Sequence, residues 1–105
     1  MPTMTVARRV VVIAEKAIER ILLEEILKLG AKGYNCTYCF GKGEHGLIED
    51  PFTGPEHGCV RIEIVTSVKV AEAIMEYLHQ DAVQHYPITS FVDNVQVDAR
   101  DTFYR

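Results

Sequence analysis

The sequence predicts an α+β protein of the ferredoxin-like kind, with the element order β-α-β-β-α-β. Three observations support this prediction. A helical pattern follows a short β-branched run, two alternating segments come next, and a second helical pattern precedes a last alternating segment. This order gives a four-stranded antiparallel sheet with two helices on one face. The length of 105 residues fits a single domain, residues 1–105.

The first half of the chain predicts a strand, a helix and a second strand. Arg9–Ala14 is a β-branched run too short for a helix, so it predicts a buried strand. The segment Glu15–Leu29 follows as a helix, and Gly30 is placed to end it. Tyr34–Phe40 alternates and predicts the second strand. The apolar positions of the helix recur at helical spacing and are Ile18, Ile21, Leu22, Ile26 and Leu29.

The second half predicts a strand, a helix and a strand. Cys59–Val65 alternates, with apolar residues at even numbers facing inward and Arg61 and Glu63 facing outward. A helix is expected from Val68 to about Val83, after the possible N-cap residues Thr66 and Ser67. Ile88–Val97 is expected as the last strand. Because both helices cover one face, the other face of the sheet stays open and invites self-association.

A long loop is expected between the second and third strands. It spans 18 residues, Gly41–Gly58, and includes five of the seven glycines. Loops of this length in compact domains commonly have a binding function. At its root, the run Gly41-Lys42-Gly43 suits an anion, because glycine backbones let N–H groups converge and lysine adds a positive charge. Glycines also occur in turns without any ligand. The residues alone therefore leave open both an anion-binding site and a simple turn.

Composition and motifs exclude several classes of function. The net charge of −4, without a basic run, argues against nucleic-acid binding, and no apolar run approaches a membrane span. A cytoplasmic protein with reduced cysteines and no export signal is therefore expected. Cys36 and Cys39 form a C-x-x-C, but residues three apart on a strand face opposite ways, which argues against a metal or redox pair. No complete catalytic set is present, so we expect no enzyme, no catalytic residue and no metal site.

The segment Val10–Gly46 resembles the opening half of PII-like signalling proteins. The matching motifs are the E-K pair at Glu15-Lys16, G-A-x-G-Y at Gly30–Tyr34 and the G-K-G at 41–43. The run Val60–Val65 matches the strand that follows the long "T-loop" of this family. The resemblance is strongest to PII-like proteins of inorganic-carbon systems, namely the carboxysome-associated PII-like protein and the PII-like regulator of a bicarbonate transporter.

The resemblance implies a homotrimer that binds an adenine nucleotide in each cleft between neighbouring subunits. Occupancy of the cleft would set the conformation of the T-loop, here about residues 41–58, and so the affinity for an unknown protein partner. By position, Asn35 would lie near the adenine, and Glu63 and Val65 would line the base pocket. The T-loop root would wrap the phosphates, and Arg100 would contact a phosphate. The implied nucleotide-binding residues are Asn35, Gly41, Lys42, Gly43, Glu63, Val65 and Arg100.

Departures from the family pattern bear on the ligand. Glu44 occupies a position where other members have a phosphate-binding arginine, and the stretch before the last strand lacks a Gly- and Lys-rich clamp. Fewer cations favour ADP or AMP over ATP. The chain also lacks the Cys-ended tail of the transporter regulator. The tyrosine that is modified in some PII T-loops is also not apparent. These two absences favour the carboxysome-associated branch, which implies bicarbonate as a further regulatory ligand and a cytoplasmic, carboxysome-associated protein without a cofactor.

Two alternative functions stay open at this point. One is a trimeric ferredoxin-like metal-binding or metal-tolerance protein, with ligands among Cys36, Cys39, His45 and His57. Metal titration distinguishes the two classes: stoichiometric metal binding without nucleotide binding would favour the metal-binding protein over the signalling protein. The other alternative is a small enzyme that slowly hydrolyses its bound nucleotide.

Overall fold

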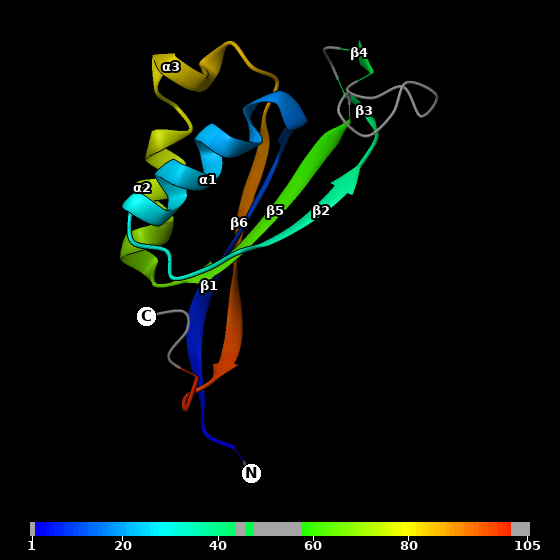
Figure 1. Ribbon diagram of the computed structural model, residues 1–105. Helices are drawn as coiled ribbons and strands as arrows, with labels where there is room; N and C mark the ends of the chain where they lie inside the picture. The colour runs from blue at the N-terminus through cyan, green and yellow to red at the C-terminus, as the bar shows by residue number, and fades with distance from the viewer. Residues whose placement is uncertain (1, 44–45, 48–57, 102–105) are drawn as a thin grey trace.

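The computed structural model describes residues 2–43, 46–47 and 58–101. Within these residues, one four-stranded sheet has the order β2-β5-β1-β6, and all its neighbouring strands are antiparallel. Helices α1 and α2 both lie on one side of this sheet (Figure 1). The predicted ferredoxin-like α+β fold is confirmed. The strands of the sheet are β1 (Met4–Glu15), β2 (Asn35–Cys39), β5 (Cys59–Thr66) and β6 (Thr89–Asp98), and the helices are α1 (Glu19–Lys28), α2 (Val68–Tyr77) and the short α3 (Asp81–Gln84).

Three elements differ from the sequence prediction by more than one residue. The first strand was predicted as Arg9–Ala14 but runs from Met4 to Glu15, because its outer part pairs with β6. The first helix begins at Glu19 rather than Glu15, after a 3₁₀ turn, η1 (Lys16–Ile18). Glu15 remains in β1 because it pairs with Cys59 of β5, and this pairing holds its backbone in the extended conformation. The second predicted helix is divided into α2 and α3 by an extended residue at Gln80. Ser67 is the N-cap of α2, as expected, and its Oγ accepts a hydrogen bond of 3.3 Å from the Val70 N–H.

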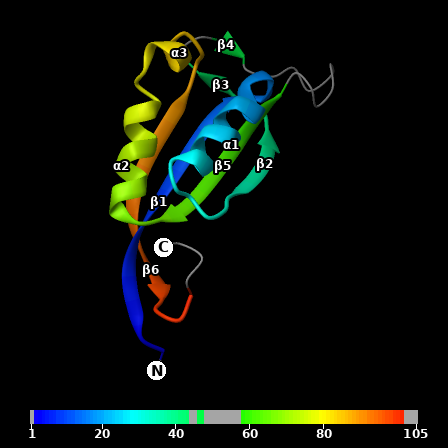
Figure 2. The same cartoon turned by 60° about the vertical axis from the view of Figure 1, so that its left-hand side comes forward.

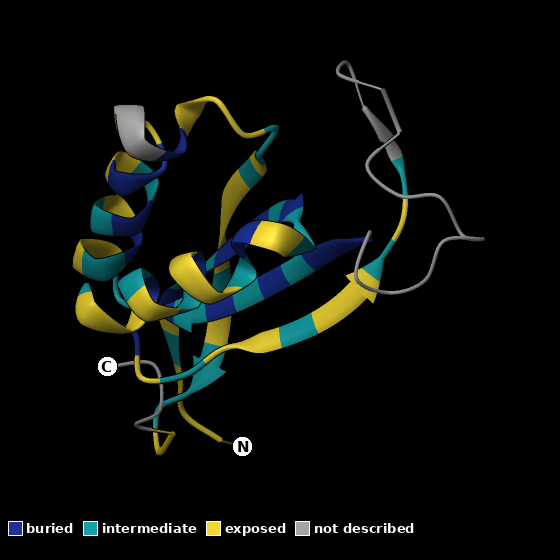
Figure 3. Ribbon diagram, turned by 45° about the horizontal axis from the view of Figure 1, so that its top comes forward, coloured by how far each residue is buried: buried dark blue, intermediate teal, exposed yellow. Residues whose placement is uncertain are grey.

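The hydrophobic core lies between the helices and the even-numbered residues of β5. Val60, Ile62 and Ile64 are fully buried, whereas Arg61 and Glu63 are half-buried on the opposite face, as predicted (Figure 3). Ile21 was expected on the buried side of the first helix but is 56% exposed. The buried residues Ile18, Leu22 and Ile26 are spaced four apart, and Ile21 does not fall on that series. The same core cluster includes residues of β1, η1, α1 and α2, among them Val10, Val12, Ile18, Leu22, Ile26, Ala71 and Ile74.

No helix among the described residues covers the other face of the sheet. Strand register places the odd-numbered residues Arg9, Glu63 and Phe91 together on this open face, and Phe91 is 44% exposed. The outer parts of β1 and β6 continue past the helices as a two-stranded arm toward the N-terminus, while the hairpin of β3 (Lys42–Gly43) and β4 (Gly46–Leu47) lies at the other end of the sheet (Figures 1 and 2). In the described part of the chain, no helix is long and apolar enough to cross a membrane.

Gly30 ends α1 as the sequence predicts. Its φ of +116° lies in a region that L-amino acids avoid, and its N–H donates to the Leu27 carbonyl at 3.1 Å. The Ala31 N–H donates to the Ile26 carbonyl at 3.3 Å. These two bonds are those of a Schellman motif, which satisfies carbonyls at the helix end and turns the chain toward β2.

We predict that Gly30→Ala destabilises the protein by about 1–2 kcal/mol, because the backbone is strained for an L-residue. The added Cβ would also lie 3.1 Å from Val70 Cγ2. Urea denaturation measures the change in free energy of unfolding. Gly41→Ala is the matched control, since a Cβ there meets nothing within 4 Å. Equal stability of the Gly30→Ala variant and the wild type would contradict the role assigned to this helix end.

Candidate functional site

A cavity of about 190 Å³ opens where β2 begins, beside β5 and the end of β6. Asn35 pairs directly with Glu63 across the two strands, so their side chains lie on the same, open face of the sheet. Val65 is two residues further along β5 and therefore shares that face. The cavity is lined by Gly33, Tyr34, Asn35, Glu63, Val65, Val97 and Asp101.

This lining combines hydrogen-bonding groups with apolar walls. The Asn35 amide can both donate and accept, and the Glu63 carboxylate, on a side chain 29% exposed, accepts only. One oxygen of Glu63 accepts from Arg61 Nη1 at 2.9 Å. Val65 and Val97 supply apolar surface. Because the described lining residues include two carboxylates and neither Lys nor Arg, the cavity suits an uncharged, hydrogen-bonding group such as a base or a sugar better than a phosphate.

The size of the cavity indicates that it holds only part of a ligand. Pockets for complete small-molecule ligands commonly enclose roughly 300–1,000 Å³, which exceeds the volume of about 190 Å³ found here. A nucleotide bound at this cavity would therefore extend beyond it. The remainder of its binding surface must come from another part of the chain or from another subunit.

The predicted phosphate-binding residues lie at the opposite end of β2. Gly41 follows Asn35 by six residues, so the two positions are separated by about 20 Å along an extended strand. The backbones of Lys42 and Gly43 form β3 and pair with Leu47 and Gly46. Only the backbone is described at these two residues, and Glu44 and His45 lie outside the described residues. The structure therefore does not bring the two predicted parts of the site together within one chain.

Arg100 lies beside the cavity residue Asp101 but is bound to another carboxylate. Its Nη2 is 2.6 Å from Oδ2 of Asp98, and its Nε lies 3.1 Å from Oδ1 of the same residue. The side chain of Arg100 is 83% exposed. This guanidinium would have to exchange Asp98 for a phosphate to play its predicted role.

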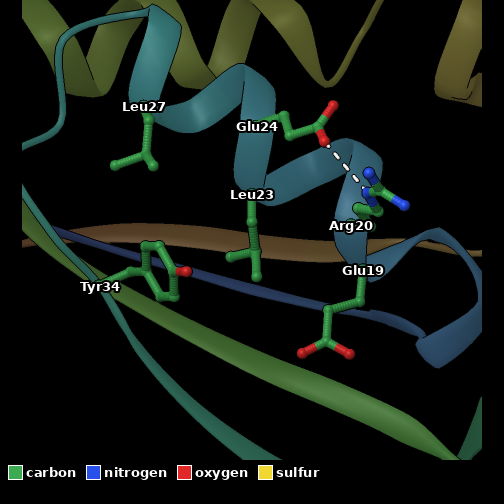
Figure 4. A pocket seen from close by; sticks show the side chains of 6 residues that line it. All are labelled: Glu19, Arg20, Leu23, Glu24, Leu27 and Tyr34. Atoms are coloured by element: carbon green, nitrogen blue, oxygen red, sulfur yellow. Dashed lines mark hydrogen bonds and ion pairs between the residues drawn. The ribbon is translucent and has the colours of Figure 1, made fainter.

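A second hollow, of about 280 Å³, lies on the other side of Tyr34, against α1 (Figure 4). Leu23, Leu27 and the Tyr34 ring form its apolar part, and the Glu19 carboxylate lies at one end. Glu24 accepts a 3.2 Å hydrogen bond from Arg20 at the rim. None of the predicted nucleotide-binding residues is among the described residues that line this hollow, so we do not include it in the candidate site.

The structure does not bring together the described ligands of the alternative metal-binding hypothesis. Cys36 pairs with Ile62 on the core side of the sheet, whereas Cys39 pairs with Cys59. Among residues 2–43, 46–47 and 58–101, no group of three or more His, Cys, Asp or Glu side chains has a metal-binding arrangement. His45 and His57, which the metal hypothesis also requires, lie outside the described residues.

Comparison with known families identifies the fold. The family model "Nitrogen regulatory protein P-II" matches residues 7–101. The chain belongs to the P-II family. A PII-like signalling protein from Thermus thermophilus is 34% identical over 90% of this chain and 91% of its own, with a TM-score of 0.75. No curated protein sequence matches the chain significantly.

More distant members share the P-II fold. The CPII protein of Thiomonas intermedia, solved with ADP, AMP and bicarbonate, is 20% identical over 95% of both chains, with a TM-score of 0.85. GlnK of B. subtilis, solved with ATP, is 17% identical over 84% of this chain and 82% of its own, with a TM-score of 0.51. At these identities the similarity establishes the fold alone.

Four cavity residues were not among the predicted site residues. Gly33 and Tyr34 belong to the G-A-x-G-Y motif, so their place beside Asn35 could have been inferred from that motif. Val97 lies in the segment predicted as the last strand, and strand register places it on the open face beside the cavity. No pattern in the sequence indicates Asp101, because it follows the last strand in an irregular turn.

The ion pair of Arg100 gives a testable change in pKa. The Arg100 guanidinium, mainly through its hydrogen bonds, holds the pKa of the Asp98 carboxyl below its ordinary value. We predict that Arg100→Gln raises the pKa of Asp98 toward that ordinary value, measured by NMR titration of the carboxyl carbon. A folded-state pKa below the unfolded one stabilises the protein above the unfolded pKa, and this stabilisation is lost as pH falls through the folded pKa. The stabilities of variant and wild type should therefore converge in acid.

Asp93 provides the internal control for this titration. Arg9 lowers the pKa of the Asp93 carboxyl through a hydrogen bond from Nη2 to Oδ2 of 2.7 Å. Because Arg9 is intact in the variant, the pKa of Asp93 should not move. An unchanged pKa at Asp98, or equal changes at both carboxyls, would contradict the assigned pairing.

Proposed function

We propose that this P-II protein is a non-enzymatic regulator that binds an adenine nucleotide, with ADP or AMP favoured over ATP. The observation that supports this most directly is the cavity at the start of β2. Three residues to which the family resemblance assigns base binding, Asn35, Glu63 and Val65, line one hollow there. They come from strands that are paired in register, so their arrangement is fixed by the sheet.

The chemistry of the cavity suits adenine and ribose. Adenine presents an amino donor and ring-nitrogen acceptors, which an Asn amide can match in both directions. A carboxylate such as that of Glu63 accepts from an amino group or a ribose hydroxyl. Val65 and Val97 can contact the faces of the base. The charged phosphates would point away from the carboxylates of Glu63 and Asp101.

We further propose that the phosphates are bound by Gly41, Lys42 and Gly43 of a neighbouring subunit in a homotrimer. Within one chain these residues lie at the far end of β2 from the cavity, but a heterologous interface can bring unlike ends of two copies together. The exposed Phe91 on the open face provides apolar surface that such an assembly would cover. Arg100 would add a cation to the same site after it releases Asp98.

Ligand preference and biological role follow from the same arrangement. The presence of Glu44 in place of an arginine favours ADP or AMP, and a bicarbonate anion is a further candidate ligand near Lys42. The ligands named for CPII, which are ADP, AMP and bicarbonate, support both suggestions. We propose that residues 1–105 act as one domain in which the filled site changes the T-loop and its affinity for a protein partner. A role in inorganic-carbon metabolism, in the cytoplasm or at a carboxysome, fits these ligands.

Asn35→Ala tests base recognition. We predict that it weakens ADP binding roughly tenfold, since a hydrogen bond worth about 1–1.5 kcal/mol is lost. Calorimetric titration measures the dissociation constant. Thr37→Ala is the matched control, because Thr37 lies on the same strand and face but outside the cavity. Equal affinities of the Asn35→Ala variant and the control would remove Asn35 from the site.

Lys42→Ala tests phosphate binding. We predict a loss of roughly 10- to 100-fold in ADP affinity, because a charge-assisted hydrogen bond is removed. The affinity for adenosine, which lacks phosphates, should not change. Lys32→Ala, which removes a lysine before β2, is the charge-matched control. If Lys42→Ala leaves ADP affinity intact, or lowers ADP and adenosine affinity equally, the phosphate role is wrong.

A further inference from the structure

Cys39 and Cys59 face each other at the last pair of the β2–β5 ladder. Their Sγ atoms lie 2.6 Å apart, although both residues are thiols in this structure. Directly opposed residues of antiparallel strands have Cα atoms about 4.5–5.5 Å apart, which falls within the range of about 4.4–6.8 Å found in disulfides. The two strands therefore already hold these cysteines in a position where a bond between them requires little movement of the backbone.

We propose that Cys39 and Cys59 form a reversible disulfide, so that the pair is a redox modification site at the base of the loop of residues 40–58. Oxidation by a peroxide proceeds in two balanced steps. The Cys39 thiolate attacks one peroxide oxygen, which gives a sulfenic acid at Cys39 and releases water or an alcohol. The Cys59 thiol then displaces the sulfenic oxygen as a second water, and the S–S bond forms.

Burial assigns different roles to the two sulfurs. Cys39 is half-buried at the end of an edge strand, so an oxidant can reach it. Cys59 is only 2% exposed on the interior strand β5, so it is protected from direct attack but lies in contact with Cys39. This is the arrangement of an attacked cysteine beside a resolving cysteine. A thiol reductant reverses the bond by exchange, through a mixed disulfide.

Cys36 is excluded from this pair by its place in the sheet. It lies opposite Ile62 and packs against the hydrophobic core, on the other face of β2 from Cys39. Burial, with a smaller contribution from Glu19, raises the pKa of its thiol, which makes the thiolate scarcer. Cys36 is therefore a built-in control for the specificity of the reaction.

The bond would close a covalent ring from Cys39 to Cys59. Gly41 lies two residues beyond Cys39, and the carbonyl of Gly58 accepts a 2.9 Å hydrogen bond from the Lys16 N–H. Both ends of the loop would then be fixed to each other and to the end of β1. This inference depends on the pairing of β2 with β5 and does not rest on nucleotide binding, so either can fail without the other.

The test treats the full-length folded protein with hydrogen peroxide or with glutathione disulfide and counts reactive thiols with a maleimide after denaturation. We expect two of the three thiols to be lost and to return after treatment with dithiothreitol. Trypsin can cleave after Lys32, Lys42 and Arg61, which places Cys59 in a different peptide from Cys36 and Cys39. Mass spectrometry should find the peptides 33–42 and 43–61 linked, with two hydrogens fewer than their sum.

Single variants assign the bond. Cys36→Ala should still lose two thiols and form the linked peptides, whereas Cys39→Ala and Cys59→Ala should form no intramolecular link. Circular dichroism before oxidation verifies that each variant is folded, and Cys59→Ser is a second choice if the buried alanine disturbs the core. A linked peptide in Cys39→Ala, or retention of all three thiols in the folded wild type under both oxidants, would overturn the proposal.

Discussion

The register between β5 and its two neighbours is the constraint on which the core, the candidate site and the cysteine pair all depend. The even-numbered residues of β5, such as Ile62, are fully buried under the helices, and Glu63 is directed to the open face. The same pairing sets Asn35 beside Glu63 and Cys39 beside Cys59. A slip of one residue would turn the core residues outward and separate both pairs. Burial of the valines and isoleucines of β5 thus fixes the chemistry on its other face.

A second consequence of this register is that the two ends of β2 differ in character. One end holds a cavity with an amide and carboxylates and without a described cation in its lining, and the other leads into glycines at the root of the long loop. A nucleotide also has two unlike ends. Its neutral base would suit the cavity, and its anionic phosphates would suit the loop root. An assembly that places the loop root of one copy near the cavity of the next would match both ends of the ligand. This explains in physical terms why the proposed site is incomplete in one chain.

The sequence predicts the faces of the sheet better than the limits of its elements. Alternation in Cys59–Val65 and the glycine at position 30 depend on local geometry, and both predictions are confirmed. The predicted start of α1 was wrong because β1 pairs with β5 as far as Glu15, which extends the strand. This pairing is a tertiary effect. Asp101 and the contact of Cys39 with Cys59 could not be predicted, since they depend on a turn and on strand register. The predicted division of Cys36 and Cys39 between two faces was sound, but it could not show which residue faces Cys39.

The central claim, that one nucleotide is bound by the cavity of one chain and the loop root of another, can be tested by mixing chains. Asn35→Ala and Lys42→Ala chains, each weakened in a different part of the site, would be unfolded together in urea, refolded and titrated with ADP by calorimetry. In a cyclic assembly with random mixing, about a quarter of the interfaces combine an intact cavity with an intact loop root. The account predicts wild-type affinity at about that fraction of sites. If the mixture binds ADP only as weakly as its two parents, the site lies within one chain and the account is contradicted.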